Sequence, residues 1–214
     1  MKNIELNIFT NCTRNAPDVS HIMRTYESFC FTFDNCRQIP VTIYLDKNPN
    51  LLAFPEYKEN LSRYFENIIV TCSLSEGYVH GINNSEADYL FQLEHDWTFN
   101  NNIPHSLCEI INNIDELGIY HFRFNKRSNI IAVWDKEMAE SSFGDFKYCI
   151  SNNLSNNPHI INRKKYIDEL CNHIKIKPGS KGIEEELNNQ GIYKSMLYGP
   201  AGYPATVSHT DGRG

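Results

Sequence analysis

The sequence contains no run of 18 or more apolar residues, so it offers no segment that could cross a membrane as a helix. It also lacks a signal-peptide pattern, because Glu5 interrupts the short apolar run at the N-terminus. The seven cysteines are odd in number and include no CxxC pair, so we expect reduced, mostly buried thiols rather than a zinc knuckle or a disulfide framework. Together these absences predict a cytoplasmic protein.

Positive charge is scarce: 20 Lys and Arg stand against 26 Asp and Glu, which gives a formal net charge of -6. A chain of this charge has no general attraction to nucleic acid or to an anionic membrane, so we expect neither as a partner. A small anionic ligand stays compatible with it, provided that a metal ion or a local basic cluster offsets the repulsion. The 214 residues include 12 Tyr and 12 Phe, enough to bury a substantial core.

Strand-like runs alternate with helical segments through the first part of the chain. This alternation is typical of βαβ units and predicts an α/β fold with a mixed, mostly parallel sheet flanked by helices. Residues 76–88 are compatible with either a helix or a loop. The expected strands are 4–9, 41–45, 68–70, 89–93 and 119–124, and the expected helices are 17–33, 55–66 and 104–117.

The second half of the sequence is less regular. Several short strand-like pieces and an Asn/Ser-rich loop at 151–157 fill residues 128–157, and residues 184–198 suggest a helix. The Gly- and Pro-rich tail after it predicts an ordered loop or a frayed end. We find neither a repeat nor a linker, so we expect one domain over residues 1–214.

Polar residues follow three of the predicted strands at the points where those strands end. They are Thr10–Arg14, Asp46 and Glu94–Asp96. The carboxyl ends of parallel strands lie at one edge of an open α/β sheet, where ligands bind. The three groups are therefore predicted to converge there.

The stretch YLFQLEHDWTF carries the sharpest chemical signal, because an apolar strand runs directly into Glu94, His95 and Asp96. Strand alternation predicts that Glu94 and Asp96 point to one side and His95 to the other. Two adjacent carboxylates repel each other unless a cation or a proton lies between them. Mn²⁺ or Mg²⁺ would suit these oxygens and would bridge to phosphate. The alternative is that Glu94 ends the strand and Asp96 begins an ordinary turn.

The longer stretch GYVHGINNSEADYLFQLEHDW resembles the segment of GT-A fold nucleotide-sugar glycosyltransferases that leads into their acidic DxD-type metal motif. The resemblance implies a Rossmann-like GT-A domain, with a nucleotide-binding part over about residues 1–100 and an acceptor-side part after it. It implies that Asp96 binds the metal and that Glu94, in place of the commoner Asp, contacts the sugar, the ribose or metal-bound water. Asn83 and Asn84 would lie in the loop that precedes the motif.

The same resemblance assigns roles to residues elsewhere in the chain. Thr10, Asn11 and Arg14 would contact the nucleotide of a UDP-sugar donor, and Asp46 would accept a hydrogen bond from its base or ribose. His209 would complete the site for the Mn²⁺ (or Mg²⁺) cofactor. For each of these residues the alternative is structural: Arg14 and Asp46 suit turns, and His209 suits a surface tail.

A catalytic base is implied by the acidic run at 184–186. In an inverting enzyme Glu185 would take the proton of the acceptor hydroxyl, although acidic residues at a helix start also complement the helix dipole, and a retaining enzyme would not need this base. Arg123, Lys126 and Arg127 either offset phosphate charge or form a solvated face. Trp97 either stacks on a sugar or belongs to the core.

More narrowly, the size and the Asn- and Ile-rich composition resemble the N-terminal glycosyltransferase domains of chlorella virus capsid-glycan proteins. That resemblance implies UDP-glucose or UDP-rhamnose as donor, a glycan or glycoprotein acceptor, action in the host cytoplasm and further domains in a longer polypeptide. Two other functions use the same residues: a metal-dependent phosphoesterase or nucleotidyltransferase, and a non-catalytic nucleotide-sugar binding module.

Overall fold

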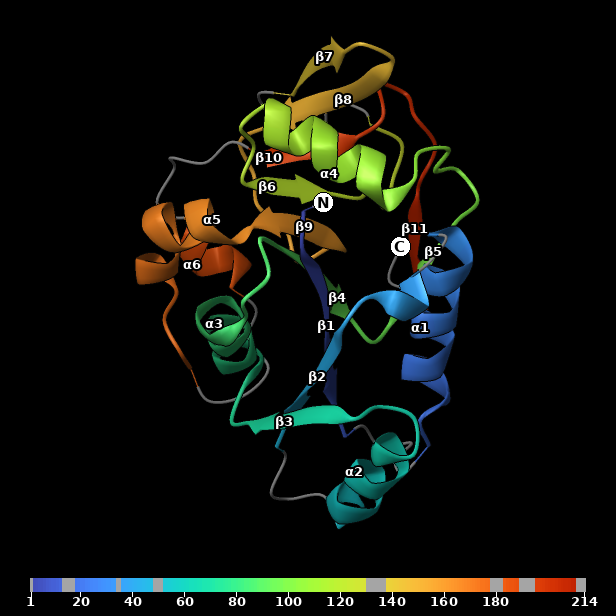
Figure 1. The fold of residues 1–214 in the computed structure, drawn as a ribbon, viewed down its shortest axis with the longest axis vertical. Coiled ribbons are helices and arrows are strands. Elements are labelled where there is room, and N and C mark those ends of the chain that lie inside the picture. Colours follow the sequence, from blue (N-terminus) through green and yellow to red (C-terminus); the bar gives the residue numbers. More distant parts are fainter. Residues whose placement is uncertain are drawn as a thin grey trace.

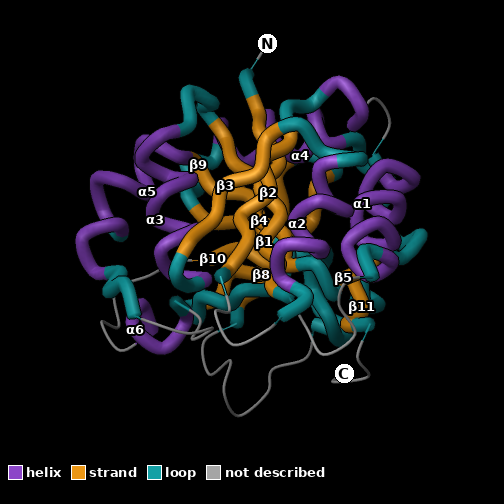
Figure 2. Tube along the Cα trace, turned by 90° about the horizontal axis from the view of Figure 1, so that it is seen from below, coloured by secondary structure: helices purple, strands orange, loops and turns teal. Residues whose placement is uncertain are grey.

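The computed structural model describes residues 2–12, 18–33, 36–47, 52–129, 138–177, 183–188 and 195–210. Within this part of the chain a central mixed sheet is covered by helices on both faces (Figure 1). Viewed from below, α3, α5 and α6 lie on one side of the strands, and α1, α2 and α4 on the other (Figure 2).

The strands are β1 Ile4–Asn11, β2 Val41–Asp46, β3 Asn67–Thr71, β4 Tyr89–Glu94, β5 Trp97–Phe99, β6 His121–Arg123, β7 Ala139–Phe143, β8 Phe146–Ser151, β9 His159–Asn162, β10 Ser195–Tyr198 and β11 Val207–His209. The α-helices are α1 Ser20–Thr32, α2 Phe54–Ser62, α3 Leu74–Asn84, α4 Leu107–Glu116, α5 Arg163–Glu169 and α6 Glu184–Asn188. Short 3-10 helices span Cys36–Gln38 and Cys171–His173.

The large sheet has the strand order β3-β2-β1-β4-β9-β6-β10-β8-β7. The first four strands are mutually parallel, and β6 and β10 are parallel to each other, whereas β9, β8 and β7 pair antiparallel with their neighbours. The expected α/β class with a mixed sheet between helices is therefore confirmed. Its parallel part comes from the regular βαβ units of the first half of the chain.

The two faces of the sheet differ in chemistry because side chains alternate along each strand. On the side of α1, α2 and α4, Phe91 of β4 lies at the centre of an aromatic cluster. Its ring centroid is 4.9 Å from that of Phe29, 5.5 Å from that of Phe124 and 5.9 Å from that of Phe99. Burial of such rings supplies much of the stabilisation of a core.

The opposite face, under α3, α5 and α6, buries polar groups as well as apolar ones. His121 and His159 lie on neighbouring strands, with their ring centroids 4.7 Å apart. The Nδ1 of His159 donates to the carbonyl of Asn157 at 2.7 Å, and the Nδ1 of His121 is 2.7 Å from the hydroxyl of Ser195. Burial lowers the pKa of both imidazoles, that of His159 to about 4, because the charged form loses its hydration.

Helix α3 packs closely on this face, and its first turn lies at the carboxyl edge of the sheet. Ser73 caps the helix, with its hydroxyl accepting from the backbone N–H of Glu76 at 3.1 Å. A Cβ at Gly81 would lie 2.8 Å from the Nδ2 of Asn7, so any larger residue would force the buried side chain of Asn7 to shift. Of the two alternatives for residues 76–88, a helix or a loop, the structure shows a helix that begins at Leu74 and ends at Asn84.

One expectation for the second half of the chain is wrong, and the structure decides between the alternatives for another. The helix expected over 184–198 ends at Asn188, and Ser195–Tyr198 is β10, inserted between β6 and β8. All four residues of β10 are buried, and a short apolar run buried on both faces does not distinguish strand from helix by its pattern. The tail is not frayed over its described residues, because β11 pairs antiparallel with β5.

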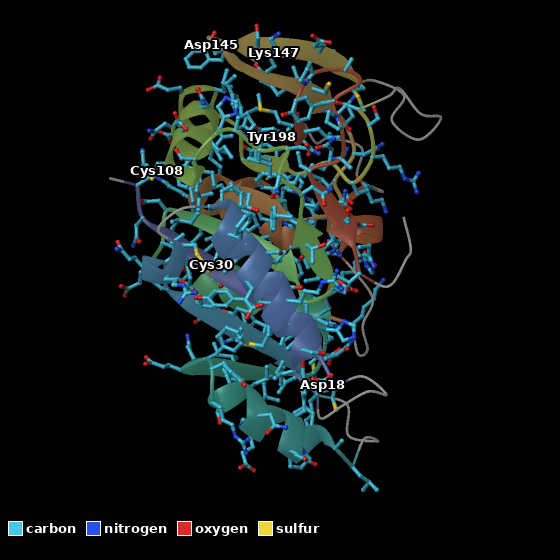
Figure 3. All side chains as sticks on the ribbon, turned by 90° about the vertical axis from the view of Figure 1, so that its right-hand side faces the viewer. Asp18, Cys30, Cys108, Asp145, Lys147 and Tyr198 are labelled. Atoms are coloured by element: carbon cyan, nitrogen blue, oxygen red, sulfur yellow. A yellow bond between two sulfur atoms is a disulfide. The ribbon has the colours of Figure 1, made fainter. Side chains whose placement is uncertain are left out.

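The expectation for the cysteines is also wrong in part. Cys30 of α1, labelled in Figure 3, forms a disulfide with Cys36 of the following 3-10 turn, which brings their Cα atoms to 5.2 Å. Of the free cysteines, Cys12 and Cys149 are buried, whereas Cys72 and Cys108 are exposed.

None of the helices that the structure describes is long and apolar enough to cross a membrane.

We predict that Phe91→Ala lowers the free energy of unfolding by about 3–5 kcal/mol, because it leaves a cavity between several rings. The control is Phe31→Ala on α1, where the side chain is 75% exposed and the change should stay within about 0.5 kcal/mol. Urea unfolding of the two variants measures the difference. Equal losses for both would contradict the central position of Phe91.

We also predict that the free energy of unfolding falls as the pH drops from about 6.5 to about 4. In this window the unfolded chain protonates His159 while the folded chain keeps it neutral, which costs up to about 3 kcal/mol. His159→Gln should flatten this part of the pH profile, whereas His21→Gln, at an exposed position, should not. Parallel profiles for the wild type and His159→Gln would refute the assignment.

Candidate functional site

The carboxyl ends of β1, β2 and β4 form one continuous edge of the sheet, as the sequence predicts. Asn11 pairs with Asp46, and Phe9 pairs with Glu94, so the three strands end almost level. The ring of Phe9 stacks on Tyr78 of α3 at 4.0 Å. Side chains in register with Phe9 share its side of the sheet, which places Glu94 on the α3 side of this edge.

The chain turns immediately after Glu94. Residues 95 and 96 form a tight turn into β5, so the strand alternation used to orient them ends at Glu94. The negative charges of Glu94 and Asp96 both raise the pKa of buried Tyr78, after the larger effect of burial. The ring of His95 contacts the backbone of β1 instead, with its Nδ1 3.3 Å from the carbonyl oxygen of Phe9.

Asp96 and His209 lie side by side although they are far apart in the sequence. The Oδ2 of Asp96 is 3.1 Å from the Nε2 of His209. Pairing of β11 with β5 sets His209 opposite Trp97, and the N–H of Thr210 donates to the carbonyl of Asp96 at 2.7 Å. The imidazole meets the indole of Trp97 edge to face at 4.7 Å. The structure thus brings together the two residues predicted to bind a metal.

The chemistry of this pair fits a divalent cation such as Mn²⁺. A carboxylate oxygen and an imidazole nitrogen are ligands that Mn²⁺ accepts, and both side chains keep limited access to solvent, at 18% and 11% exposed. Within the described ranges, no group of three or more His, Cys, Asp or Glu side chains could hold a metal ion. Phosphate oxygens and water would be suitable further ligands for a cation held by this pair.

Only some of the residues predicted to contact the nucleotide lie at this edge. Asn11 and Asp46 lie at the edge, and burial together with the negative charge of Glu76 raises the pKa of Asp46. Thr10 points to the other side of the sheet, where its hydroxyl is 2.7 Å from that of Tyr57 in α2. Arg14 lies outside the described residues.

Asn83 and Asn84 are not brought to this edge, which corrects the expectation for them. They end α3 and are exposed, and the guanidinium of Arg163 donates to the carbonyl of Asn83 at 3.3 Å. Because α3 runs antiparallel to β4, its end lies beside the beginning of that strand, about 17 Å from Glu94 along β4. The helix presents its first turn to the site instead, including Glu76.

The acidic run predicted to supply a base begins α6. Glu185 lies in this helix, but its side chain is outside the described part of the structure. The carboxylate of the preceding Glu184 accepts from the hydroxyl of Ser155 at 2.9 Å and from the backbone N–H of Asn156. The charge of Glu184 also raises the pKa of Tyr78, as those of Glu94 and Asp96 do.

A cleft of about 860 Å³ opens beside α6, and sequence reasoning did not anticipate it. The only sequence feature that points to it is the group of cations Arg123, Lys126 and Arg127, for which the sequence allows either contact with phosphate or a solvated face. Lys126 connects this cleft to the Asp96–His209 pair, since its Nζ lies 6.0 Å from the centre of the Trp97 ring. Trp97 itself is buried and belongs to the core. The described lining residues are Arg123, Asn125–Asn129, Met138, Asn153–Ser155, Asn157, Glu184, Asn188 and Leu197.

Comparison with known proteins supports the fold. No protein-family model and no curated protein sequence matches this chain. Among solved structures it is similar to S. aureus TarS. A structure of TarS 1–349 superposes on 97% of this chain with a TM-score of 0.58 and 11% sequence identity. The complex of TarS 1–349 with UDP-GlcNAc superposes on 98% of this chain with a TM-score of 0.57 and 14% sequence identity. A TarS 1–349 complex with UDP has a TM-score of 0.56 at 11% identity.

The similarity to TarS extends over only part of the TarS chain. This chain spans 60% of TarS 1–349 and 36% of the longer TarS structure, which has 12% identity and a TM-score of 0.56. At these identities the comparison establishes the fold alone. The expected GT-A-type α/β architecture, with a large mixed sheet flanked by helices, is therefore confirmed for this chain.

Proposed function

We propose that this protein is a metal-dependent glycosyltransferase that moves a sugar from a UDP-sugar donor to a glycan acceptor. The observation that carries the proposal is the 3.1 Å approach of Asp96 and His209 at the edge where the parallel strands end. Ligands of open α/β sheets bind at this edge. The architecture is that of TarS, a GT-A-like glycosyltransferase that has been crystallised with UDP-GlcNAc and with UDP.

In this proposal the donor lies across the ends of β1, β2 and β4. Asn11 and Asp46 would contact the uridine, and Asp96 and His209 would hold Mn²⁺ or Mg²⁺. The bound cation would supply Lewis-acid stabilisation of the charge that develops on the leaving UDP. Glu94, at the end of β4, contacts the sugar, the ribose or a metal-bound water. The overall charge of -6 does not oppose this, because the cation and nearby basic residues offset it.

Glu185 is the proposed general base, on an inverting route. It would remove the proton of the acceptor hydroxyl as that oxygen attacks the anomeric carbon. The neighbouring Glu184 supports the proposal, because its contacts with Ser155 and Asn156 tie the start of α6 to the wall of the cleft. That contact would hold the next residue in a defined position.

For the donor we propose a hexose of the glucose or rhamnose type, and for the acceptor a glycan or glycoprotein. A role in viral capsid glycosylation in the host cytoplasm, within a longer polypeptide, remains the narrower form of the proposal. The UDP-GlcNAc held by TarS adds N-acetylhexosamines to the donors worth testing.

The other two functions have less support. A phosphoesterase or nucleotidyltransferase would want further metal ligands, and the described residues contain no group of three or more candidate ligands. A non-catalytic binding module would bind the donor without hydrolysing it. Slow release of UDP from a UDP-sugar distinguishes the enzyme from the module, and release of free phosphate or pyrophosphate would favour the phosphoesterase or nucleotidyltransferase.

We predict that Mn²⁺ strengthens UDP binding by about tenfold or more and that Asp96→Asn abolishes this gain, because the substitution removes a charged ligand of the metal. Isothermal titration with Mn²⁺ and with a chelator measures it. Asp145→Asn, on the exposed turn of the β7–β8 hairpin, is the matched control (Figure 3). Binding of UDP that ignores the metal would sink the proposal.

For the base, we expect Glu185→Gln to lower the rate of UDP-sugar hydrolysis about a hundredfold or more, because the amide cannot accept the proton of the attacking water. Glu184→Gln should lower this rate less, since its carboxylate accepts two hydrogen bonds from the cleft wall. Release of UDP under Mn²⁺ is measured for both. The reverse order of the two variants would assign the base to Glu184.

A further inference from the structure

Helix α1 lies alongside β5, the strand that directly follows Asp96 (Figure 1 and Figure 2). The rings of Phe29 and Phe99 meet edge to face, with their centroids 5.8 Å apart. The hydroxyl of Ser28 accepts a hydrogen bond from the backbone N–H of Phe99 at 3.2 Å. These contacts hold the helix against the strand that begins at the candidate site.

One residue of α1 carries a hydroxyl into this apolar packing. The buried residues of the helix are Ile22, Thr25 and Phe29, and each of them is 0% exposed. Their spacing of three and four places them on one face of the helix. A buried hydroxyl is costly unless it forms a hydrogen bond. The Oγ1 of Thr25 donates to the carbonyl oxygen of His95 at 2.6 Å, which satisfies it.

The carbonyl that Thr25 contacts belongs to the peptide unit that leads into Asp96. A peptide unit is planar, so the carbonyl of His95 lies in one plane with the nitrogen and the Cα of Asp96. A hydrogen bond to this oxygen therefore sets the tilt of that plane. The tilt in turn sets the direction in which the Asp96 side chain leaves the backbone. Because β4 ends at Glu94, this plane lies beyond the regular strand.

Two other elements hold the backbone on either side of this peptide unit. The N–H of His95 donates to the carbonyl of Phe9 in β1 at 2.9 Å, and the N–H of Thr210 donates to the carbonyl of Asp96 at 2.7 Å. Thr25 supplies the anchor that lies between these two. A carboxylate on a backbone fixed in this way loses little conformational freedom when it binds a ligand.

We propose that Thr25 is a positioning residue of the candidate site. Through the plane of the peptide unit between residues 95 and 96, its hydroxyl aims the Asp96 carboxylate at His209 and at the cation that this pair would hold. The inference rests on the proposed function, since it concerns the same pair. Thr25 acts only through the backbone of the turn, because its side chain is fully buried under α1.

Two substitutions separate the hydroxyl from the volume of the side chain. Thr25→Val fills the same space without a donor, whereas Thr25→Ser keeps the donor and loses a methyl group. We expect the gain in UDP affinity that Mn²⁺ produces to fall about fivefold in Thr25→Val, the factor that corresponds to one hydrogen bond, and to return in Thr25→Ser. Isothermal titration of UDP with Mn²⁺ and with a chelator measures the gain.

The matched control is Ile22→Val, which trims a buried side chain on the same face of α1 without touching the turn. It should keep the full gain, although it weakens the packing of the helix. A purely structural role of Thr25 predicts instead that the gain stays at its wild-type value in Thr25→Val, or that Thr25→Ser loses as much of it as Thr25→Val.

A second measurement needs neither UDP nor metal. We expect hydrogen exchange of the Thr210 amide to be about fivefold faster in Thr25→Val than in the wild type or Thr25→Ser, because its acceptor on Asp96 loses an anchor. Exchange of the Phe33 amide, which donates to the carbonyl of Phe29 at the end of α1, should stay unchanged and shows that the helix is intact.

An unchanged gain in Thr25→Val, an unchanged exchange rate of the Thr210 amide, or equal effects of Thr25→Val and Thr25→Ser would each overturn the proposal. A wild-type chain whose UDP affinity ignores Mn²⁺ would refute the proposed function. Amide exchange at Thr210 would still decide whether Thr25 positions Asp96, so the two failures are distinguishable.

Discussion

The antiparallel pairing of β5 with β11 is the constraint on which the candidate site depends. β5 follows Asp96 directly, and β11 ends with His209, so three paired residues bring a carboxylate and an imidazole to 3.1 Å. The hydrogen bond from Thr210 to the carbonyl of Asp96 extends this contact by one residue. Backbone hydrogen bonds from Asn100 to Thr206 and from Thr206 to Asn125 hold the same C-terminal segment just before the ladder.

The division of the sheet into two unlike faces explains why the site opens where it does. The face under α1, α2 and α4 is filled largely by the aromatic rings around Phe91. The other face carries Glu94, His159 and Arg123 on successive strands, in the order β4, β9 and β6. This polar row links the edge where the donor is proposed to bind with the cleft beside α6.

Much of the first half of the fold could be predicted from the sequence, because each βαβ unit there is local. The strands at 41–45 and 89–93 and their shared edge follow from periodicity and from the rule for parallel strands. Prediction failed where the partner is distant. β10 is a strand because β6 and β8 lie on either side of it. The Cys30–Cys36 disulfide is a local exception, because its two cysteines are six residues apart and meet only through the way the chain turns after α1.

Some residues of the candidate site can likewise be predicted from the sequence, and others cannot. Asp96 stands out in the sequence because an acidic residue follows a buried strand, and only the family resemblance points to His209. Asn83 and Asn84 lie away from the edge because α3 runs antiparallel to β4, and the sequence does not show that direction. Nothing local indicated that Glu184 would contact Ser155 or that Lys126 would lie over Trp97.

By itself, the sequence determined the strand periodicity, the acidic group after β4 and the overall negative charge, since these are properties of neighbouring residues or of composition. Only the tertiary structure decided which charges meet. The contacts of Asp96 with His209 and of α6 with the 151–157 loop join segments whose approach depends on strand order and packing, and no local pattern encodes that order.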